Sequence, residues 1–331
     1  MARARKSLID LDSTPYYHCI NRCIRRSYLC GDDKYTGNNF DHRRAWLIDR
    51  IKFLSTVFSI DIAAYAIMSN HYHLVLKVNR DEALNLTNDE VIERWYQLYH
   101  GCMLVDRYRA GEELDSGCLF RVNEIVNDWR NRLYDISWFM RNLNEFIARK
   151  ANYEDNCTGR FWEGRFKSQA LLDESAVISC MMYVDLNPIR AKMADSLRES
   201  DFTSIQERIN QYQAFKKHIK KQSVKKSDIT VLQQPKQLLK FGCSVDKNTI
   251  PFTLFDYLEL ADFSSRLVVP NKRGSIESTK PVILNELNIE IDTWINTIQH
   301  FRRQYANFAG SKTSLIKCAH SHHHNWYKGC A

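Results

Sequence analysis

The sequence has little of what marks several large protein classes. It contains no stretch of about eighteen consecutive apolar residues, the length that a membrane-spanning helix needs. The first residues are basic, but polar residues and Pro15 stand where a signal peptide would have its apolar segment. Eleven glycines and six prolines in 331 residues exclude collagen-like and low-complexity architectures. We therefore expect a soluble protein of the cytoplasm that makes no use of a membrane.

Two common chemical motifs are also missing. None of the ten cysteines forms a Cys-x-x-Cys pair, and Cys19 and Cys23 are four residues apart, so neither a zinc ribbon nor a thioredoxin motif is indicated. Most cysteines are expected to be small core residues. Residues 310–313 read Gly-Ser-Lys-Thr, the end of a phosphate-binding loop, but the first glycine of that motif is absent. ATP is therefore not an expected cofactor.

The charge of the chain is unevenly distributed. The formal net charge is +8, yet residues 1–200 hold 28 basic and 28 acidic side chains, whereas residues 201–331 hold 19 and 11. An acidic block at 81–135, with 12 acidic and 6 basic residues, is typical of an insertion. Segment 201–250 is expected to be a basic linker, either solvated or in contact with nucleic acid, because six lysines crowd into eleven residues: Lys216, Lys217, Lys220, Lys221, Lys225 and Lys226.

The hydrophobic pattern predicts an α+β fold. Alternation and apolar runs indicate strands at 16–22, 60–68, 71–78 and 166–172, and helical spacing indicates helices at 40–58, 136–150 and 175–186. This order is typical of a ferredoxin-like antiparallel sheet with helices on one face and the other face free for a substrate. Residues 1–200 would form this domain. An apolar stripe from Ile291 to Phe301 predicts a helical accessory domain at 251–331.

Two short segments carry the residues suited to chemistry. His71 and His73 lie two apart on a strand, so both imidazoles project from one face, where they could share a metal ion or form ordinary hydrogen bonds. Tyr183 and Asn187 are four apart, one helical turn. Pro188 disfavours helical geometry before it, so Asn187 is predicted to cap a second short helix. The alternative for this pair is a buried tyrosine and a capping asparagine without chemistry.

Together these segments resemble a known superfamily. The strand Ala66–Leu76, with its His-Tyr-His, is similar to the metal motif of the single-tyrosine HUH transposases, and Tyr183–Ala191 is similar to their nucleophile helix. Tyr17-His18 with Asn21-Arg22, and Phe161-Trp162 with the segment 165–168, match in kind and order. Within the superfamily the sequence most resembles the REP-associated tyrosine transposases of bacteria. The resemblance covers roughly residues 10–200.

The resemblance implies a fold, an activity and a set of site residues. The fold would be the HUH nuclease fold, with Tyr183 as nucleophile and His71, His73 and Asn187 as ligands of Mg²⁺ or Mn²⁺. The activity would be cleavage and rejoining of single-stranded or hairpin DNA, at repetitive palindromes, through a 5′-phosphotyrosine. The protein would associate with the bacterial nucleoid, as a monomer. The alternatives are a DNA-binding protein that kept the fold and lost the chemistry, and a metal hydrolase of small phosphates.

Several basic residues are candidate DNA contacts. Phosphate-binding charge alternates with aromatic rings that can stack on unpaired bases between Arg160 and Lys167. The basic N-terminus is either a DNA-binding arm or an incidental solvated end, and Arg190 is either a phosphate clamp or a surface residue. The candidates are Arg3, Arg5, Lys6, Arg22, Arg160, Arg165, Lys167 and Arg190. A histidine and cysteine cluster at 318–330 matches no standard zinc spacing and is interpreted as a solvated tail rather than a zinc site.

Overall fold

The computed structural model divides the chain into two compact units. The first comprises Met1–Ala45, Ile62–Lys77 and Trp162–Ala331, and the second comprises Trp46–Asp61 and Val78–Phe161. The structure describes residues 8–24, 29–32, 37–219, 234–242, 248–268 and 280–329. Within these ranges, no helix combines the length and the hydropathy that crossing a membrane requires.

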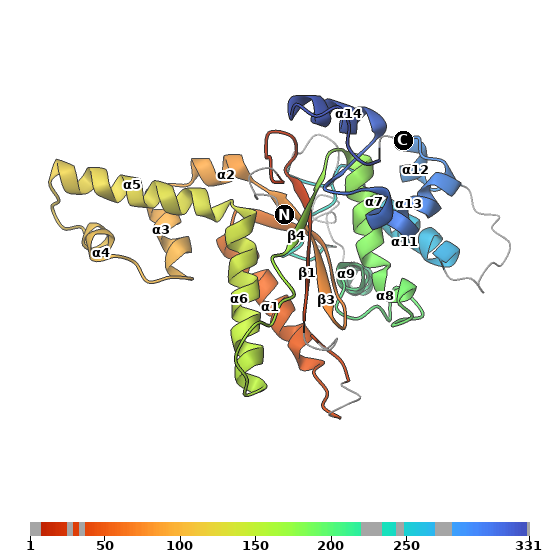
Figure 1. Ribbon diagram of the computed structural model, residues 1–331, viewed down its shortest axis with the longest axis horizontal. Coiled ribbons are helices and arrows are strands. Elements are labelled where there is room, and N and C mark those ends of the chain that lie inside the picture. The colour runs from red at the N-terminus through yellow and green to blue at the C-terminus, as the bar shows by residue number, and fades with distance from the viewer. Residues whose placement is uncertain are drawn as a thin grey trace. The chain divides into compact units, whose positions relative to one another are not determined.

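The elements follow one another as strands mixed with helices (Figure 1). The strands are β1 (Tyr16–Arg22), β2 (Ile60–Ile67), β3 (His71–Val78), β4 (Lys167–Leu171) and β5 (Phe308–Ala309). The helices are α1 (His42–Val57), α2 (Arg80–Asn85), α3 (Asn88–Tyr96), α4 (Met103–Arg109), α5 (Ser116–Leu133), α6 (Ile136–Glu154), α7 (Glu174–Asp185), α8 (Asn187–Arg190), α9 (Ser204–Ile219), α11 (Leu254–Val268), α12 (Val282–Glu286), α13 (Ile291–Gln304) and α14 (Lys312–Ser321).

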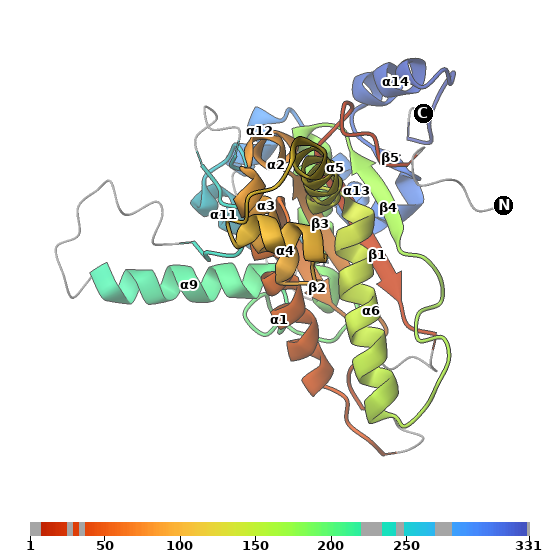
Figure 2. The same ribbon diagram turned by 90° about the vertical axis from the view of Figure 1, so that its left-hand side faces the viewer.

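Over the described residues, the sheet has five strands in the order β2-β3-β1-β4-β5. The four predicted strands are all present, and β1 pairs antiparallel with both β3 and β4. The prediction of a wholly antiparallel sheet is wrong, because β5 adds to the edge in parallel with β4 (Figure 2). The added pairing includes bonds from the Ala170 and Leu172 N–H groups to the carbonyls of Asn307 and Ala309, each 2.8 Å long. A two-residue strand is too short to show alternation, so it could not be predicted from the hydrophobic pattern.

The prediction that one face of the sheet is free of helices is also wrong. On the face that carries His73, the ring of Tyr183 from α7 lies 5.8 Å from the imidazole, centroid to centroid. The opposite face is also covered, since Tyr17, Tyr72 and Leu74 are fully buried there. Helix α7 is accordingly buried on all sides from Ala176 to Asp185. A helix that is apolar all round belongs inside a core, between two layers.

Residues of the C-terminal part complete that core. Helix α13 buries Trp294, Ile298 and Phe301, as its apolar stripe predicts, and packs beside α7 (Figure 1). The indole Nε1 of Trp294 donates a 2.9 Å hydrogen bond to Ser264 of α11. One apolar cluster therefore includes residues of the sheet, α7, α11 and α13. Residues 251–331 belong to the same compact unit as the sheet.

The acidic block 81–135 folds as helices of the second unit, with α3 and α4 beside α5 (Figure 1). Local sequence sets their starts: Thr87 and Glu90 form a capping box at α3, and the Asp115 side chain caps α5. Stacked rings of Trp95 and Trp129, with centroids 5.6 Å apart, join α3 to α5. Most cysteines that the structure describes are buried, as predicted. The eight described cysteines form no disulfide bond: Cys19, Cys23, Cys30, Cys102, Cys118, Cys157, Cys180 and Cys318.

Candidate functional site

The strand register brings the predicted site residues onto one face of the sheet. Arg22 of β1 lies opposite His71, and Ile20 lies opposite His73. On its other side, β1 places His18 opposite Gln169 of β4. Paired residues of adjacent strands point to the same face. His18, His71, His73 and Gln169 therefore share a face.

A chain of hydrogen bonds fixes the protons of two histidines. The Gln169 amide Nε2 donates to the carbonyl of Ala306 (2.8 Å), which orients its Oε1 toward His18 Nδ1, 3.2 Å away. An amide oxygen only accepts, so His18 carries its proton on Nδ1. The neutral ring then accepts at Nε2, which lies 2.9 Å from His73 Nδ1. His73 therefore carries its proton on Nδ1, and its Nε2 has a free lone pair.

Burial keeps these imidazoles neutral. It lowers the pKa of His18 and of His71 to about 4, and that of His73 well below its usual range. His73 Nε2 is buried and has no hydrogen-bond partner. His71 bonds through Nδ1 to the side-chain oxygen of Asn70, 2.6 Å away, which leaves its Nε2 unprotonated as well. Neutral imidazoles with a bare Nε2 are the form that ligates a metal.

The ring of Tyr183 packs against the imidazole rings of His73 and His18. Its ring is 5.8 Å from that of His73 and 6.1 Å from that of His18, both edge to face. The Phe301 ring of α13 stacks on it at 5.6 Å, and the Arg190 guanidinium lies 4.0 Å from its ring centroid. The residue is 8% exposed. The structure thus brings the predicted nucleophile and the predicted metal ligand His73 together.

Asn187 lies one turn beyond Tyr183, but it is not the predicted helix cap. The N-cap of α8 is Leu186, which makes no side-chain capping bond, and Asn187 is the first residue of that helix. The chain continues almost without a break from α7 into α8, because Leu186 keeps helical dihedrals. The Asn187 oxygen accepts a 3.2 Å bond from Arg190, and its buried amide nitrogen has no partner.

Arg190 holds α8 to α13. One nitrogen of its guanidinium donates to the carbonyls of Ile298 (3.3 Å) and Gln299 (3.1 Å). These carbonyls are accessible because α13 is interrupted at His300, whose dihedrals are not helical. Arg190 is therefore not a plain surface residue. A contact between it and a phosphate stays a prediction.

The residues present fit a divalent cation through the two histidines. Among the described residues, no group of three or more His, Cys, Asp and Glu side chains is arranged to hold a metal. The candidate donors are the unprotonated nitrogens of His71 and His73, whose ring centroids lie 4.9 Å apart. Asn187, whose oxygen already accepts a bond from Arg190, is the third ligand that the sequence resemblance implies. Two nitrogens and one amide oxygen leave room for phosphate oxygens around Mg²⁺ or Mn²⁺.

Three of the predicted DNA-contacting residues gather beside the histidines. Arg22, Arg165 and Lys167 line one pocket of about 480 Å³ together with His71. Arg160 is exposed and belongs to the second unit. Arg3, Arg5 and Lys6 lie outside the described residues.

Sequence reasoning missed the parts of the site that come from elsewhere in the chain. Gln169 and Phe301 carry no motif, and their contacts with His18 depend on strand pairing and helix packing. His18 had a signal, since it alternates with Ile20 and Arg22 on a strand that begins after Pro15. Nothing in the sequence indicated that it bonds to His73.

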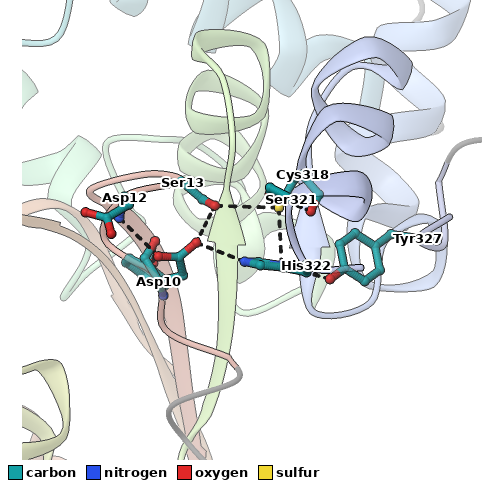
Figure 3. A network of polar contacts seen from close by, with 8 residues as sticks. Asp10, Asp12, Ser13, Cys318, Ser321, His322 and Tyr327 are labelled. Atoms are coloured by element: carbon teal, nitrogen blue, oxygen red, sulfur yellow. Dashed lines mark hydrogen bonds and ion pairs between the residues drawn. The ribbon is translucent and has the colours of Figure 1, made fainter. Parts of the chain in front are cut away.

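His322, one of the C-terminal histidines, takes part in a network of polar contacts with Asp10, Cys318 and Tyr327 (Figure 3). His322 Nε2 lies 2.9 Å from an Asp10 carboxylate oxygen, and its Nδ1 lies 2.9 Å from the Tyr327 hydroxyl. Cys318 is buried, with its sulfur 3.7 Å from His322 Nδ1. The prediction of a solvated tail is therefore wrong for these two residues. Their contacts with Asp10 and Ser13 join residues 10–13 to α14 and the residue after it. Cys330 lies outside the described residues.

Comparison with known proteins gives a distant structural similarity. No protein-family model matches the chain, and no curated protein matches it. One solved structure does, that of a REP-associated tyrosine transposase bound to a REP hairpin. The identity is 12%, the TM-score is 0.38, and the match covers 63% of this chain and 86% of the other. At this level the likeness is one of fold alone, and we derive no residue role from it.

Proposed function

We propose that this protein is a metal-dependent endonuclease and strand transferase for single-stranded or hairpin DNA, with Tyr183 as its nucleophile. The observation that supports it best is the contact between Tyr183 and His73, whose buried Nε2 has a free lone pair and no partner. Cleavage of a phosphodiester by this chemistry needs a phenol as nucleophile and, beside it, a nitrogen that is free to bind a metal ion. The choice of repetitive palindromes as the substrate rests on the sequence resemblance alone.

Tyr183 would attack the phosphorus of a phosphodiester. The bond from its phenolic oxygen to phosphorus forms, the bond from phosphorus to the 3′ oxygen breaks, and the phenolic proton is lost while the leaving oxygen gains one. The products are a 5′-phosphotyrosine and a free 3′-OH. Because the phosphodiester energy is kept in the covalent link, a 3′-OH can reseal the strand without ATP.

His71 and His73, with Asn187, would hold the cation. Bound there, Mg²⁺ or Mn²⁺ supplies a Lewis acid that offsets charge on the non-bridging phosphate oxygens. Phe301 and Arg190 fix the Tyr183 ring from its two neighbouring helices. A fixed ring lowers the entropic cost of aligning the oxygen with phosphorus.

The test is formation of a covalent adduct. A hairpin oligonucleotide labelled at its 3′ end, the end that stays joined to a 5′-phosphotyrosine, is incubated with the full chain and Mn²⁺, and the products are separated under denaturing conditions. We expect label on the protein band with the wild type and with Tyr153→Phe, which changes an exposed tyrosine of α6. We expect none with Tyr183→Phe or with EDTA.

Three outcomes contradict the proposal. An adduct that persists in Tyr183→Phe shows that another residue is the nucleophile. Binding of the hairpin without any adduct, at every metal tested, supports a DNA-binding protein that has lost the chemistry. Turnover of small phosphate esters without an adduct supports a metal hydrolase.

A further inference from the structure

Two pockets adjoin at the edge of the histidine face. The pocket beside His71, about 480 Å³, also contains Arg22 and Asn70. The other, about 520 Å³, contains His18 and Gln169. The two pockets share four of their lining residues: Ile20, Arg165, Lys167 and Arg302. The two pockets therefore form one groove that passes His71 and His18, and we call it the cationic groove.

The walls of the cationic groove are strongly basic. Arg22, Arg165, Lys167 and Arg302 line it and all four are exposed, whereas Glu163 is its one acidic lining residue among those described. The charge of Arg302 contributes to the lowered pKa of His18, His71 and His73, after the larger effect of burial. This guanidinium thus lies close to the imidazoles as well as to the groove.

Arg302 reaches the groove because of how α13 is fastened. The helix is interrupted at His300, Arg190 binds the two carbonyls before the interruption, and Phe301 stacks on Tyr183. The next residue in the chain is Arg302, at the groove where both pockets meet. Arg303 follows it, is also exposed, and lines neither pocket.

We propose that Arg302 binds a phosphodiester of a single DNA strand that lies in the cationic groove beside His71. This rests on the proposed function and adds a residue from outside the segment that resembles the transposases. A guanidinium pairs with a phosphate through two parallel hydrogen bonds. A basic groove with aromatic walls is the surface that unpaired strands use, and Phe166 and Tyr305 line the half beside His18.

The experiment measures binding apart from chemistry. The full chain is titrated into a fluorescein-labelled single-stranded oligonucleotide in EDTA, at a series of salt concentrations, and anisotropy is read. We expect Arg302→Ala to weaken binding about tenfold and to reduce the slope of log K against log salt by about 0.7, the share of one phosphate contact. Arg303→Ala is the matched control and should bind as the wild type does. Thermal melts check that both variants fold.

The result separates this inference from the proposed function. Wild-type affinity and slope in Arg302→Ala, or an equal loss in Arg303→Ala, overturns the inference even if the Tyr183 adduct forms. A loss confined to Arg302→Ala supports it even if no adduct ever forms. The same oligonucleotide is also tested as a duplex. If the wild type binds the duplex more tightly than the single strand, and Arg302→Ala loses as much affinity for the duplex, the assignment of a single strand is overturned.

Discussion

His18 Nε2 lies 2.9 Å from His73 Nδ1, and this one bond determines which nitrogen of His73 is left for a ligand. The proton arrangement begins at Gln169, whose oxygen accepts from His18. A partner of this kind orients a metal ligand and fixes its tautomer, which typically changes metal affinity by 10–100-fold. His18 and Gln169 are therefore positioning residues for the candidate metal ligand.

The first prediction concerns that hydrogen-bond chain. Gln169→Leu removes the acceptor for His18, so His73 is no longer held with its proton on Nδ1. We expect the affinity for Mn²⁺ to fall at least about tenfold, measured by titration calorimetry on the protein without DNA. Gln169→Glu keeps an oxygen acceptor and should retain most of the affinity. Equal affinities for the Leu variant and the wild type would show that the chain does not control His73.

The second prediction concerns Asp185, the last residue of α7, which lies between Tyr183 and Asn187 in the sequence. Its carboxylate accepts bonds from Ser204 (2.5 Å) and Tyr257 (2.6 Å), yet burial raises its pKa to about 6 from 3.8. The folded state thus holds this proton more tightly than the unfolded chain. The resulting stabilisation is full below pH 4 and is lost as the pH rises through 6.

Asp185→Asn removes this titration while keeping the shape of the side chain. The difference in unfolding free energy between wild type and variant should fall by roughly 2.4 kcal/mol between pH 4 and pH 7. Urea unfolding of both proteins at four pH values measures it. Parallel pH profiles for the two proteins would count against a raised pKa.

The third prediction concerns truncation after residue 200. The sequence alone favours independence of the C-terminal part: deletion of 201–331 would weaken the salt dependence of DNA binding more than the chemistry at Tyr183. The contacts lead us to expect the opposite. The deletion removes Phe301 and Ile298 from the core against α7, and it removes β5 from the sheet. Loss of even one such buried aromatic ring costs about 3–5 kcal/mol.

We therefore expect residues 1–200 alone to show no cooperative unfolding and no adduct. Circular dichroism during urea titration, with the full chain as reference, makes the measurement. A cooperative transition together with adduct formation in the truncated protein would restore the division into independent parts.

The fourth prediction concerns the contact between His322 and Asp10, which we call the anchor because it joins residues 10–13 to α14. His322→Gln loses the contact with Asp10 and should lower the unfolding free energy by about 1 kcal/mol, because the pair is only partly buried. His320→Gln, at an exposed position of α14, is the control and should have no effect. Thermal denaturation at pH 7 compares them. Identical melting temperatures for the two variants would show that the anchor does not contribute.

Local pattern sufficed for part of the fold. Four strands and the helices α1, α6 and α7 follow from alternation and helical spacing. Asn187 is the first residue of α8 and not its cap, because it is helical although it directly precedes Pro188, and Leu186 takes the N-cap position. Predictions that depend on one residue at a helix end are the least secure of this kind.

The residues chemically suited to the site can be read from the sequence: two histidines on one strand face, and a tyrosine and an asparagine one helical turn apart. The residues that surround them are set by strand pairing and helix packing. The pairing of β1 with β4 brings Gln169 to His18, and the packing of α13 on α7 brings Phe301 and Arg302 to the histidine face. These contacts join residues more than a hundred positions apart. Periodicity in a sequence reports which face of an element is buried, but not which distant element buries it.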